Sequence, residues 1–237
     1  GESLSLTGSG VLGAASAGTQ TITNNNTLAI ADGSGGLASN YTLSGATINV
    51  TIIPRTLNVT LSREYDGTTS VSGALLTPTF DSLQGGETLA LSGTGSVSTA
   101  NVGSSKAVSL GSIALVAGSG NPSNYSLNSA TMNVTQRVIN LDGIRAYDAT
   151  TNVLSSDINT FGNIVSGETL TISGTGSVGT NSVAMNKAIT VGSLSLGNGS
   201  GLASNYTLTG GTHTFDISPV SVNAVSYTHL TLPTKQM

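Results

Sequence analysis

Polar and apolar residues alternate with a period of two along much of this chain. Residues 56–61 (TLNVTL) alternate strictly, and residues 88–91 and 109–115 follow the same pattern. A period of two is typical of a strand that buries one face, whereas no window has the apolar spacing of an amphipathic helix. The sequence therefore predicts short β-strands and no helix.

The alternation changes phase at a recurring point. After Tyr41 and Leu43 the apolar positions move by one residue and resume at Ala46, and the same shift follows Tyr125. A one-residue slip would turn the apolar side chains of a strand to the opposite face of its sheet. We therefore expect a β-bulge or a tight turn here, for which Gly45 is well suited.

The chain repeats itself with a period of about 80 residues, a length typical of tandem domains. Residues 63–69 (REYDGTT) recur at 145–151 (RAYDATT), and residues 86–97 (GETLALSGTGSV) recur at 167–178 (GETLTISGTGSV). The tripeptide Ser-Asn-Tyr marks the same point in three repeats, at residues 39–41, 123–125 and 204–206.

These matches set the expected domain boundaries. Residues 1–54 are the C-terminal part of a first repeat, residues 55–136 and 137–219 are complete repeats, and residues 220–224 begin a fourth. Residues 225–237 resemble the translation of a transposase-type sequencing adapter, so we expect an assembly artefact in a metagenomic fragment. The alternative is a genuine terminal strand.

Each repeat has room for five to seven short strands, separated by turns rich in glycine. The predicted fold is all-β, with small, mostly antiparallel β-sandwiches of the Ig-like type arranged end to end as an elongated rod. A β-grasp-like unit with a mixed sheet is the alternative.

Composition excludes several classes of protein. Charged residues make up 8% of the chain and the net charge is −4, which gives no basic surface for a nucleic acid. The chain has no cysteine, so disulfide frameworks, thiolate metal sites and cysteine nucleophiles are excluded. No apolar run approaches the roughly 20 residues of a membrane-spanning helix, so we expect no membrane span in this fragment.

The clearest motif is Tyr-Asp-Gly-Thr-Thr, at Tyr65, Asp66 and Gly67, with a second copy at Tyr147 and Asp148. An Asp side chain in such a segment accepts a hydrogen bond from the backbone N–H two residues on and closes an Asx turn. We expect the ring of Tyr65 to pack on the core while its hydroxyl caps a loop. A sugar or metal site on the same residues is the alternative.

In the second copy of this motif, Ala149 stands where the first has Gly67. The substitution predicts that the position does not require a positive φ. The Ser-Asn-Tyr markers are likewise interpreted as structural, namely Asn40, Tyr41, Asn124, Tyr125, Asn205 and Tyr206.

Charged residues are few, yet several recur at equivalent positions of the two complete repeats: Arg63 and Arg145, Glu87 and Glu168, Lys106 and Lys187. One interpretation is that they form ion pairs, such as Glu87 with Lys106, that tie strands together. The other is that they are isolated surface charges worth about 0–1 kcal/mol each.

We assign no catalytic, cofactor-binding or metal-ligating residue. His213 falls in the column held by Ile48 and Met132 and is interpreted as a tolerated strand substitution, since no second histidine or cysteine stands nearby to build a zinc site. The loop after Asp32 resembles part of a calcium loop, but its counterparts lack the acid, so a repeated calcium site is unsupported.

Residues 1–224 resemble the YDG/MBG-type tandem repeats of very large bacterial surface proteins, especially the filamentous-haemagglutinin-like adhesins of Gram-negative bacteria. The resemblance rests on the Tyr-Asp-Gly-Thr-Thr segment, the Ser-Asn-Tyr-Thr-Leu segment and the length of the repeat. It implies secretion, display at the outer surface of the cell and a repetitive all-β rod. The family supplies no catalytic residues to carry over.

Two functions follow as expectations. The first is a non-enzymatic stalk that spaces or presents a binding region of a secreted adhesin, with neighbouring repeats of the same chain as its partners. The alternative is a module that binds host or matrix glycans, or mucin, weakly and gains strength from repetition. A hydrolase is the third class and has no carboxylate pair in favour of it.

Overall fold

The computed structural model describes residues 1–45 and 47–223. The adapter-like residues 225–237, together with residue 224, lie outside the described residues. Two compact units are present, one formed by residues 1–135 and the other beginning at residue 136. Each is described by itself.

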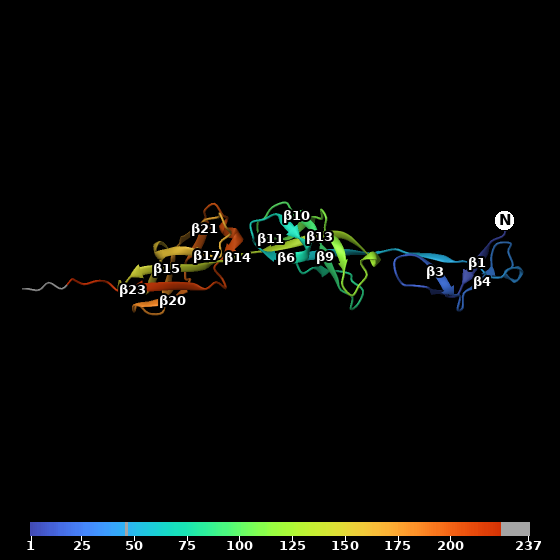
Figure 1. Ribbon diagram of the computed structural model, residues 1–237, viewed down its shortest axis with the longest axis horizontal. Coiled ribbons are helices and arrows are strands. Elements are labelled where there is room, and N and C mark those ends of the chain that lie inside the picture. The colour runs from blue at the N-terminus through green and yellow to red at the C-terminus, as the bar shows by residue number, and fades with distance from the viewer. Residues whose placement is uncertain (46, 224–237) are drawn as a thin grey trace, which may run out of the picture. The chain divides into compact units, whose positions relative to one another are not determined.

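Residues 1–54 build small sheets of their own, which appear in blue in Figure 1. One sheet pairs β1 (Leu4–Thr7) with β4 (Ala29–Asp32), and a three-stranded sheet contains β2 (Val11–Leu12), β3 (Gly18–Asn24) and β5 (Asn49–Ile52). A 3-10 turn, η1 (Ala38–Asn40), carries the first Ser-Asn-Tyr marker. These strands share no sheet with the strands that follow residue 54 in the described part of this unit.

The rest of the first unit is one complete repeat. Its strands are β6 (Arg55–Glu64), β7 (Ser70–Ser72), β8 (Thr79–Phe80), β9 (Leu89–Ser92), β10 (Thr94–Val97), β11 (Gly103–Ser109), β12 (Ala114–Ala117) and β13 (Tyr125–Thr135), with 3-10 turns η2 (Gly73–Leu75) and η3 (Pro122–Asn124). Six of them form a sheet in the order β7-β10-β11-β13-β6-β8, and β9 pairs with β12. Residues 55–135 are all described, so this repeat has eight strands, more than the five to seven predicted.

The second unit repeats this plan. Its strands are β14 (Arg137–Val138), β15 (Asn140–Ala146), β16 (Asn152–Leu154), β17 (Ile158–Gly162), β18 (Leu170–Ser173), β19 (Thr175–Val178), β20 (Ala184–Thr190), β21 (Ser195–Asn198), β22 (Tyr206–Thr207) and β23 (His213–Ser218), with 3-10 turns η4 (Ser155–Asp157) and η5 (Ala203–Asn205). The six-stranded sheet has the order β16-β19-β20-β23-β15-β17, which matches the first unit strand for strand. Two short pairs, β14 with β22 and β18 with β21, complete it.

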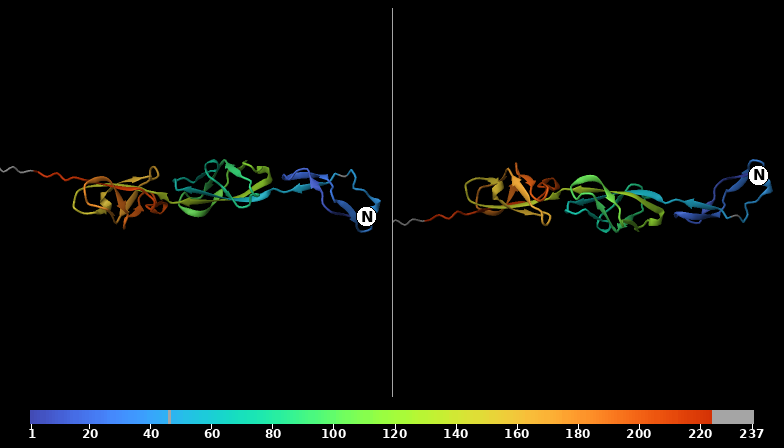
Figure 2. Two further views of the ribbon diagram at one scale, coloured as in Figure 1. Left: turned by 90° about the horizontal axis from the view of Figure 1, so that it is seen from below. Right: turned by 90° about the horizontal axis from the view of Figure 1, so that it is seen from above.

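The prediction of an all-β fold is confirmed, because the described residues contain strands and only five short 3-10 turns beside them. Each main sheet curls into a half-barrel. Figure 2 shows the strands of both units from two further sides. Most strand pairs of the described residues are antiparallel, as predicted, but both six-stranded sheets are mixed. The central pairs, β6 with β13 and β15 with β23, run parallel. A period of two reports which face of a strand is buried and does not report the direction of its neighbour.

The core follows from the alternation. In β6, Leu57, Val59 and Leu61 are buried, while the residues between them are exposed. Leu57 packs with Leu89 of β9 and Tyr125 of β13, so the small β9–β12 sheet covers the inner face of the curled sheet. The interior of this repeat therefore lies between these two sheets.

The predicted phase shift is confirmed in two copies. The register of β13 against β6 slips between Leu127 and Ser129, which is a β-bulge. In the first copy Gly45 has φ of +75°, in a turn. The third copy is longer at this point, and the strand breaks into β22 and β23 instead.

This break corrects the alignment of His213. His213 pairs with Leu141 in the parallel ladder, whereas Met132 pairs with Leu61. The equivalent lysines of the two repeats show which residues correspond. Lys106 pairs with Met132 and Lys187 pairs with Phe215, so Phe215 is the counterpart of Met132. His213 therefore does not share a column with Met132. The two-residue insertion that follows Leu208 shifts the register between the copies, and a comparison of apolar spacing alone does not detect it.

Candidate functional site

The Tyr-Asp-Gly-Thr-Thr motif forms the predicted Asx turn in both repeats. Asp66 Oδ1 accepts the backbone N–H of Thr68 at 2.9 Å, and Asp148 Oδ1 accepts that of Thr150 at 2.9 Å. The motif follows directly on β6 or β15, so the turn closes the strand that opens each repeat. The motif also bonds to distant strands, since the N–H of Tyr65 donates to the carbonyl oxygen of Thr135 and that of Tyr147 donates to Ser218.

That arginine is the anchor of the loop. Arg63 donates to the carbonyl oxygens of Thr68 and Ser70 and lies 3.1 Å from Asp66 Oδ2. Its side chain is only 10% exposed, so these bonds lie largely out of water. Arg63 thus forms an ion pair, but with Asp66 three residues further along the same loop and not with a residue of another strand.

Arg145 occupies the same place in the second unit. It donates to the carbonyl oxygens of Thr150 and Asn152 and lies 3.0 Å from Asp148 Oδ1. Its guanidinium carbon is 5.5 Å from the centre of the Phe215 ring, within the range of a cation–π contact. Arg63 and Arg145 therefore hold the motif loop of their repeats in the same way.

The backbone of the turn contradicts one expectation. Gly67 has φ of +76° and Ala149 has φ of +65°, so both copies adopt the left-handed conformation. A positive φ is therefore required by the turn, and Ala149 adopts it against its own preference because the Asx turn and Arg145 hold the loop. An L-residue other than glycine costs about 1–2 kcal/mol there.

We expect Ala149→Gly to raise the free energy of unfolding of the second unit by about 0.5–1 kcal/mol, since relief of the left-handed strain exceeds the entropy that glycine gains when unfolded. The reciprocal change, Gly67→Ala, is expected to lower the free energy of unfolding of the first unit by a similar amount. Native-state hydrogen exchange, read by mass spectrometry on peptides of each unit, measures both. A stabilising Gly67→Ala would contradict the requirement for a positive φ.

The two motif tyrosines differ in exposure. Tyr65 is 4% exposed and packs in the core as predicted, whereas Tyr147 is 42% exposed. The ring of the motif therefore has no single role that both repeats share.

The tyrosine of Ser-Asn-Tyr has a partner in every copy that the sequence did not indicate. Tyr41 and Tyr206 donate their hydroxyls to Glu2 and Glu168 at 2.6 Å, and Tyr125 donates to Glu87. The carboxylate stabilises the protonated hydroxyl and raises the pKa of Tyr41 and of Tyr125, and desolvation adds to both shifts. The recurrence of both residues in all three copies was the signal that could have revealed this pair.

The lysines do not take the partners expected of them. Lys106 Nζ donates to the carbonyl oxygens of Thr99 and Asn101, at 2.6 and 2.5 Å, and Lys187 Nζ donates to Thr180 Oγ1 at 2.8 Å. Each lysine therefore caps the loop that leads into its own strand. Desolvation lowers the pKa of Lys106, and the positive charge of Arg63 contributes to the same shift.

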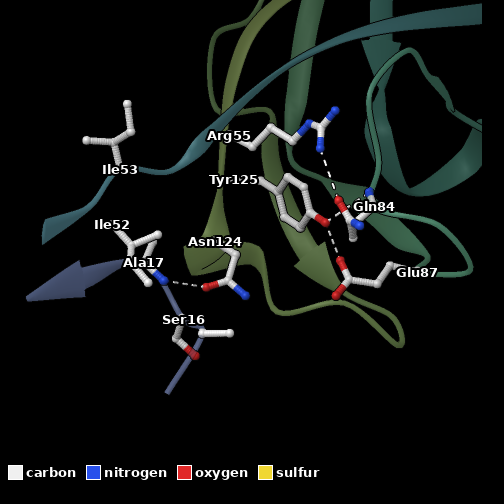
Figure 3. A pocket seen from close by; sticks show the side chains of 10 residues that line it. Ser16, Ala17, Ile52, Ile53, Arg55, Gln84, Glu87, Asn124 and Tyr125 are labelled. Carbon is white, nitrogen blue, oxygen red and sulfur yellow. Dashed lines mark hydrogen bonds between the residues drawn. The ribbon is translucent and has the colours of Figure 1, made fainter. Parts of the chain in front are cut away.

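A pocket of about 480 Å³ lies beside Tyr125 in the first unit (Figure 3). It is lined by Ala15, Ser16, Ala17, Ile52, Ile53, Arg55, Gln84, Glu87, Asn124 and Tyr125. Several of its polar groups are hydrogen-bonded to one another. Asn124 Oδ1 accepts the N–H of Ala17 at 2.8 Å, and Arg55 donates to Gln84 Oε1 at 3.1 Å. Figure 3 shows the Tyr125 hydroxyl directed at Gln84 and Glu87.

The remaining marker asparagines are placed differently from Asn124. Asn205 is 1% exposed in the second unit, whereas Asn40 lies at the surface of the first. The three copies therefore share the 3-10 turn that carries the asparagine, but not the exposure of its side chain.

His213 has a structural part to play. It is buried, its Nδ1 accepts the backbone N–H of Leu141 at 3.1 Å, and its Nε2 lies 2.9 Å from the carbonyl oxygen of Leu208. These bonds fit a neutral ring protonated on Nε2. The side chain thus satisfies backbone groups where the two-residue insertion divides β22 from β23, so His213 does more than tolerate a strand position.

Acid should weaken the second unit through Asp148. The N–H of Thr150 is the largest cause that lowers the pKa of this carboxyl, and the hydroxyl of Thr150 and the charge of Arg145 add to it. A folded-state pKa below the unfolded value means that stability is present above about pH 4 and is lost as the pH falls through the folded pKa. We expect Asp148→Asn to flatten the fall in stability between about pH 5 and pH 2. An unchanged slope, measured by urea denaturation, would contradict this.

Among the described residues, no group of three or more His, Asp and Glu side chains is arranged to hold a metal ion. No helix among the described residues has the length and apolar character needed to cross a bilayer.

Comparison with known families gives one result. The family model described as "YDG domain" matches residues 51–132 and again residues 133–232. No curated protein and no solved structure matches the chain.

Proposed function

We propose, since the chain belongs to the YDG domain family, that its repeats form a non-enzymatic stalk in a secreted bacterial surface protein of the adhesin type. In this role the repeats space or present a binding region at the outside of the cell. Secretion and adhesion are part of the proposal.

The observation that carries the proposal is the use of the repeated polar residues. Arg63 and Arg145 hold backbone carbonyls, Asp66 and Asp148 close turns, and the tyrosines of Ser-Asn-Tyr bind a glutamate of the same repeat. A catalytic or binding site needs polar groups directed at a substrate. Here the groups that recur between repeats stabilise the repeat itself, as expected of a module selected for its fold.

The surface composition supports the same role. Charged residues are few, the chain has no cysteine, and hydroxyl and amide side chains dominate the exposed positions of the strands. Such a surface provides few sites for strong non-specific association. The chain also folds without a disulfide, which suits a long exported array of repeats.

Small-angle X-ray scattering of the whole chain tests the stalk. A compact domain of this length has a radius of gyration of about 18 Å. We expect a clearly larger value and an asymmetric distance distribution with a long tail, together with the β-type circular dichroism of a folded chain. A value near that of a compact globule, with intimate packing between the repeats, would contradict the proposal.

A weak glycan-binding module is the second candidate, and the exposure of Tyr147 favours it. Tyr147 is 42% exposed beside Asp148, whose side chain is 47% exposed, and exposed aromatic residues next to polar groups suit sugar contact. Glycan-array binding that is lost in Tyr147→Ala without loss of folding would support this function. Tyr65→Ala does not serve this test, because Tyr65 is buried.

A further inference from the structure

We propose that the central parallel strands of each repeat, β6 with β13 and β15 with β23, form a mechanical clamp that resists tension along the chain. The inference deepens the proposed stalk, because a surface stalk under shear flow carries load from one end of a repeat to the other. It is independent of any ligand.

The order of the strands in the chain gives the clamp its direction. β6 is the first strand of the repeat and β13 is the last. Because they are parallel, their N-terminal residues Arg55 and Tyr125 pair with each other, and so do their C-terminal residues Glu64 and Thr135. Tension pulls Arg55 backward and Thr135 forward, so the two strands are made to slide past each other. The ladder of hydrogen bonds is then loaded all at once, whereas antiparallel terminal strands paired at one end would peel open one bond at a time.

The position of the pair in the sheet protects it. Both strands are interior, with β11 beside β13 and β8 beside β6. On the inner face, Val59, Leu61 and Met132 are buried, so water has little access to the ladder from that side. Hydrogen bonds that are shielded from water are harder to replace while they are being stretched.

Side chains on the outer face add bonds between the same two strands. Ser129 Oγ donates to Asn58 Oδ1 at 2.7 Å, and the hydroxyls of Thr60 and Thr131 lie 3.3 Å apart. In the second unit, Thr214 Oγ1 donates to Asp142 Oδ1 at 2.8 Å. These contacts also have to break before the strands can slide.

The family motif lies at the far end of the clamp. The backbone N–H of Tyr65 donates to the carbonyl of Thr135 at 2.9 Å, and that of Tyr147 donates to Ser218 at 2.8 Å. Arg63 and Arg145 then fix the loop that follows. The motif thus continues the ladder by one bond and anchors its last residues, which gives Tyr-Asp-Gly a mechanical role in addition to its turn.

The two repeats should differ in strength. The ladder between β6 and β13 contains ten residue pairs with one bulge. In the second unit the break after Thr207 leaves two pairs between β14 and β22 and six between β15 and β23. A divided ladder can fail in parts, so the second repeat is expected to unfold at a lower force.

Single-molecule force spectroscopy on the whole chain tests the clamp, because a chain without cysteine accepts attachment at introduced cysteines. The pair Ile53→Cys and Thr135→Cys loads β6 and β13 in shear. The pair Ser62→Cys and Thr135→Cys pulls on the same repeat but peels the two strands from one end. Gln136→Cys with Val220→Cys loads the second repeat. All of these positions are exposed.

We expect the first repeat to unfold at a clearly higher force in shear than in the peeling geometry, at equal loading rate. The second repeat should unfold at a force between these two values. Deleting Thr209 and Gly210, which removes the insertion, should raise the force of the second repeat toward that of the first. Folding of each variant is checked by its equilibrium free energy of unfolding.

Equal forces in the shear and peeling geometries would overturn the clamp. That result would leave the stalk standing if scattering still gives an extended particle, since a spacer need not be strong. A compact particle by scattering, with a high shear force, would instead overturn the stalk and leave the clamp.

Discussion

Phe215→Ala should lower the free energy of unfolding of the second unit by about 3–5 kcal/mol. Phe215 is fully buried, and its ring fills the space opposite Gly143. A Cβ on Gly143 would come within 2.9 Å of the ring and 2.6 Å of the Asp157 carbonyl oxygen. Because the backbone is so close, the site cannot collapse around alanine, and a cavity is left.

Native-state hydrogen exchange by mass spectrometry measures this loss, because peptides from the two units are read separately. Met185→Ala is the matched control in the same unit. Met185 is 75% exposed, and its truncation should cost less than about 0.5 kcal/mol. Similar losses in the two variants would show that Phe215 is not a core residue.

Arg63→Met should lower the free energy of unfolding of the complete repeat in the first unit by about 2–3 kcal/mol. Methionine keeps much of the apolar stem but removes the donors that serve the carbonyls of Thr68 and Ser70. The loop then holds unsatisfied acceptors, and Asp66 loses its cation.

Arg55→Met is the control for the charge itself. Arg55 is exposed and donates to the side chain of Gln84, so its replacement should cost less than about 1 kcal/mol. Urea denaturation, monitored with hydrogen exchange on peptides of residues 55–135, compares the two. An equal effect of both substitutions would mean that Arg63 acts only as a surface charge.

The parts of the fold that follow from local chemistry could be predicted. Alternation located β6 and its buried residues Leu57, Val59 and Leu61, because burial of one face imposes a period of two. The Asx turn at Asp66 followed from the reach of a short carboxylate side chain. The bulge after Leu127 followed from the change of phase.

The parts that depend on distant contacts could not be predicted. The parallel direction of β13 against β6 is set by how the chain crosses the repeat, and the pattern of apolar residues is the same in either direction. The left-handed Ala149 is maintained by Arg145 and the Asx turn, and its own side chain gives the opposite signal.

Comparison of the repeats in sequence also does not reveal that two facing core positions change size together. Leu61 pairs with Met132 in the first unit, and Gly143 pairs with Phe215 in the second. The larger ring of Phe215 therefore accompanies the loss of the side chain that Leu61 provides in the first unit. Both pairs fill the same space in the core. The exchange becomes visible only once the strand register is known, because the insertion after Leu208 displaces the apparent alignment.

The parallel pairing of the first and last strands underlies the module, the clamp and the place of the family motif. Cross-linking by paired cysteines tests it most directly. In the parallel register Thr56 pairs with Ser126, whereas Thr135 lies at the other end of β13, roughly 30 Å away at about 3.3 Å per residue. We expect Thr56→Cys with Ser126→Cys to form an intramolecular disulfide on mild oxidation of the folded chain, and Thr56→Cys with Thr135→Cys to form none. A disulfide in the second pair alone, identified by mass spectrometry after proteolysis, would show antiparallel strands and contradict the account.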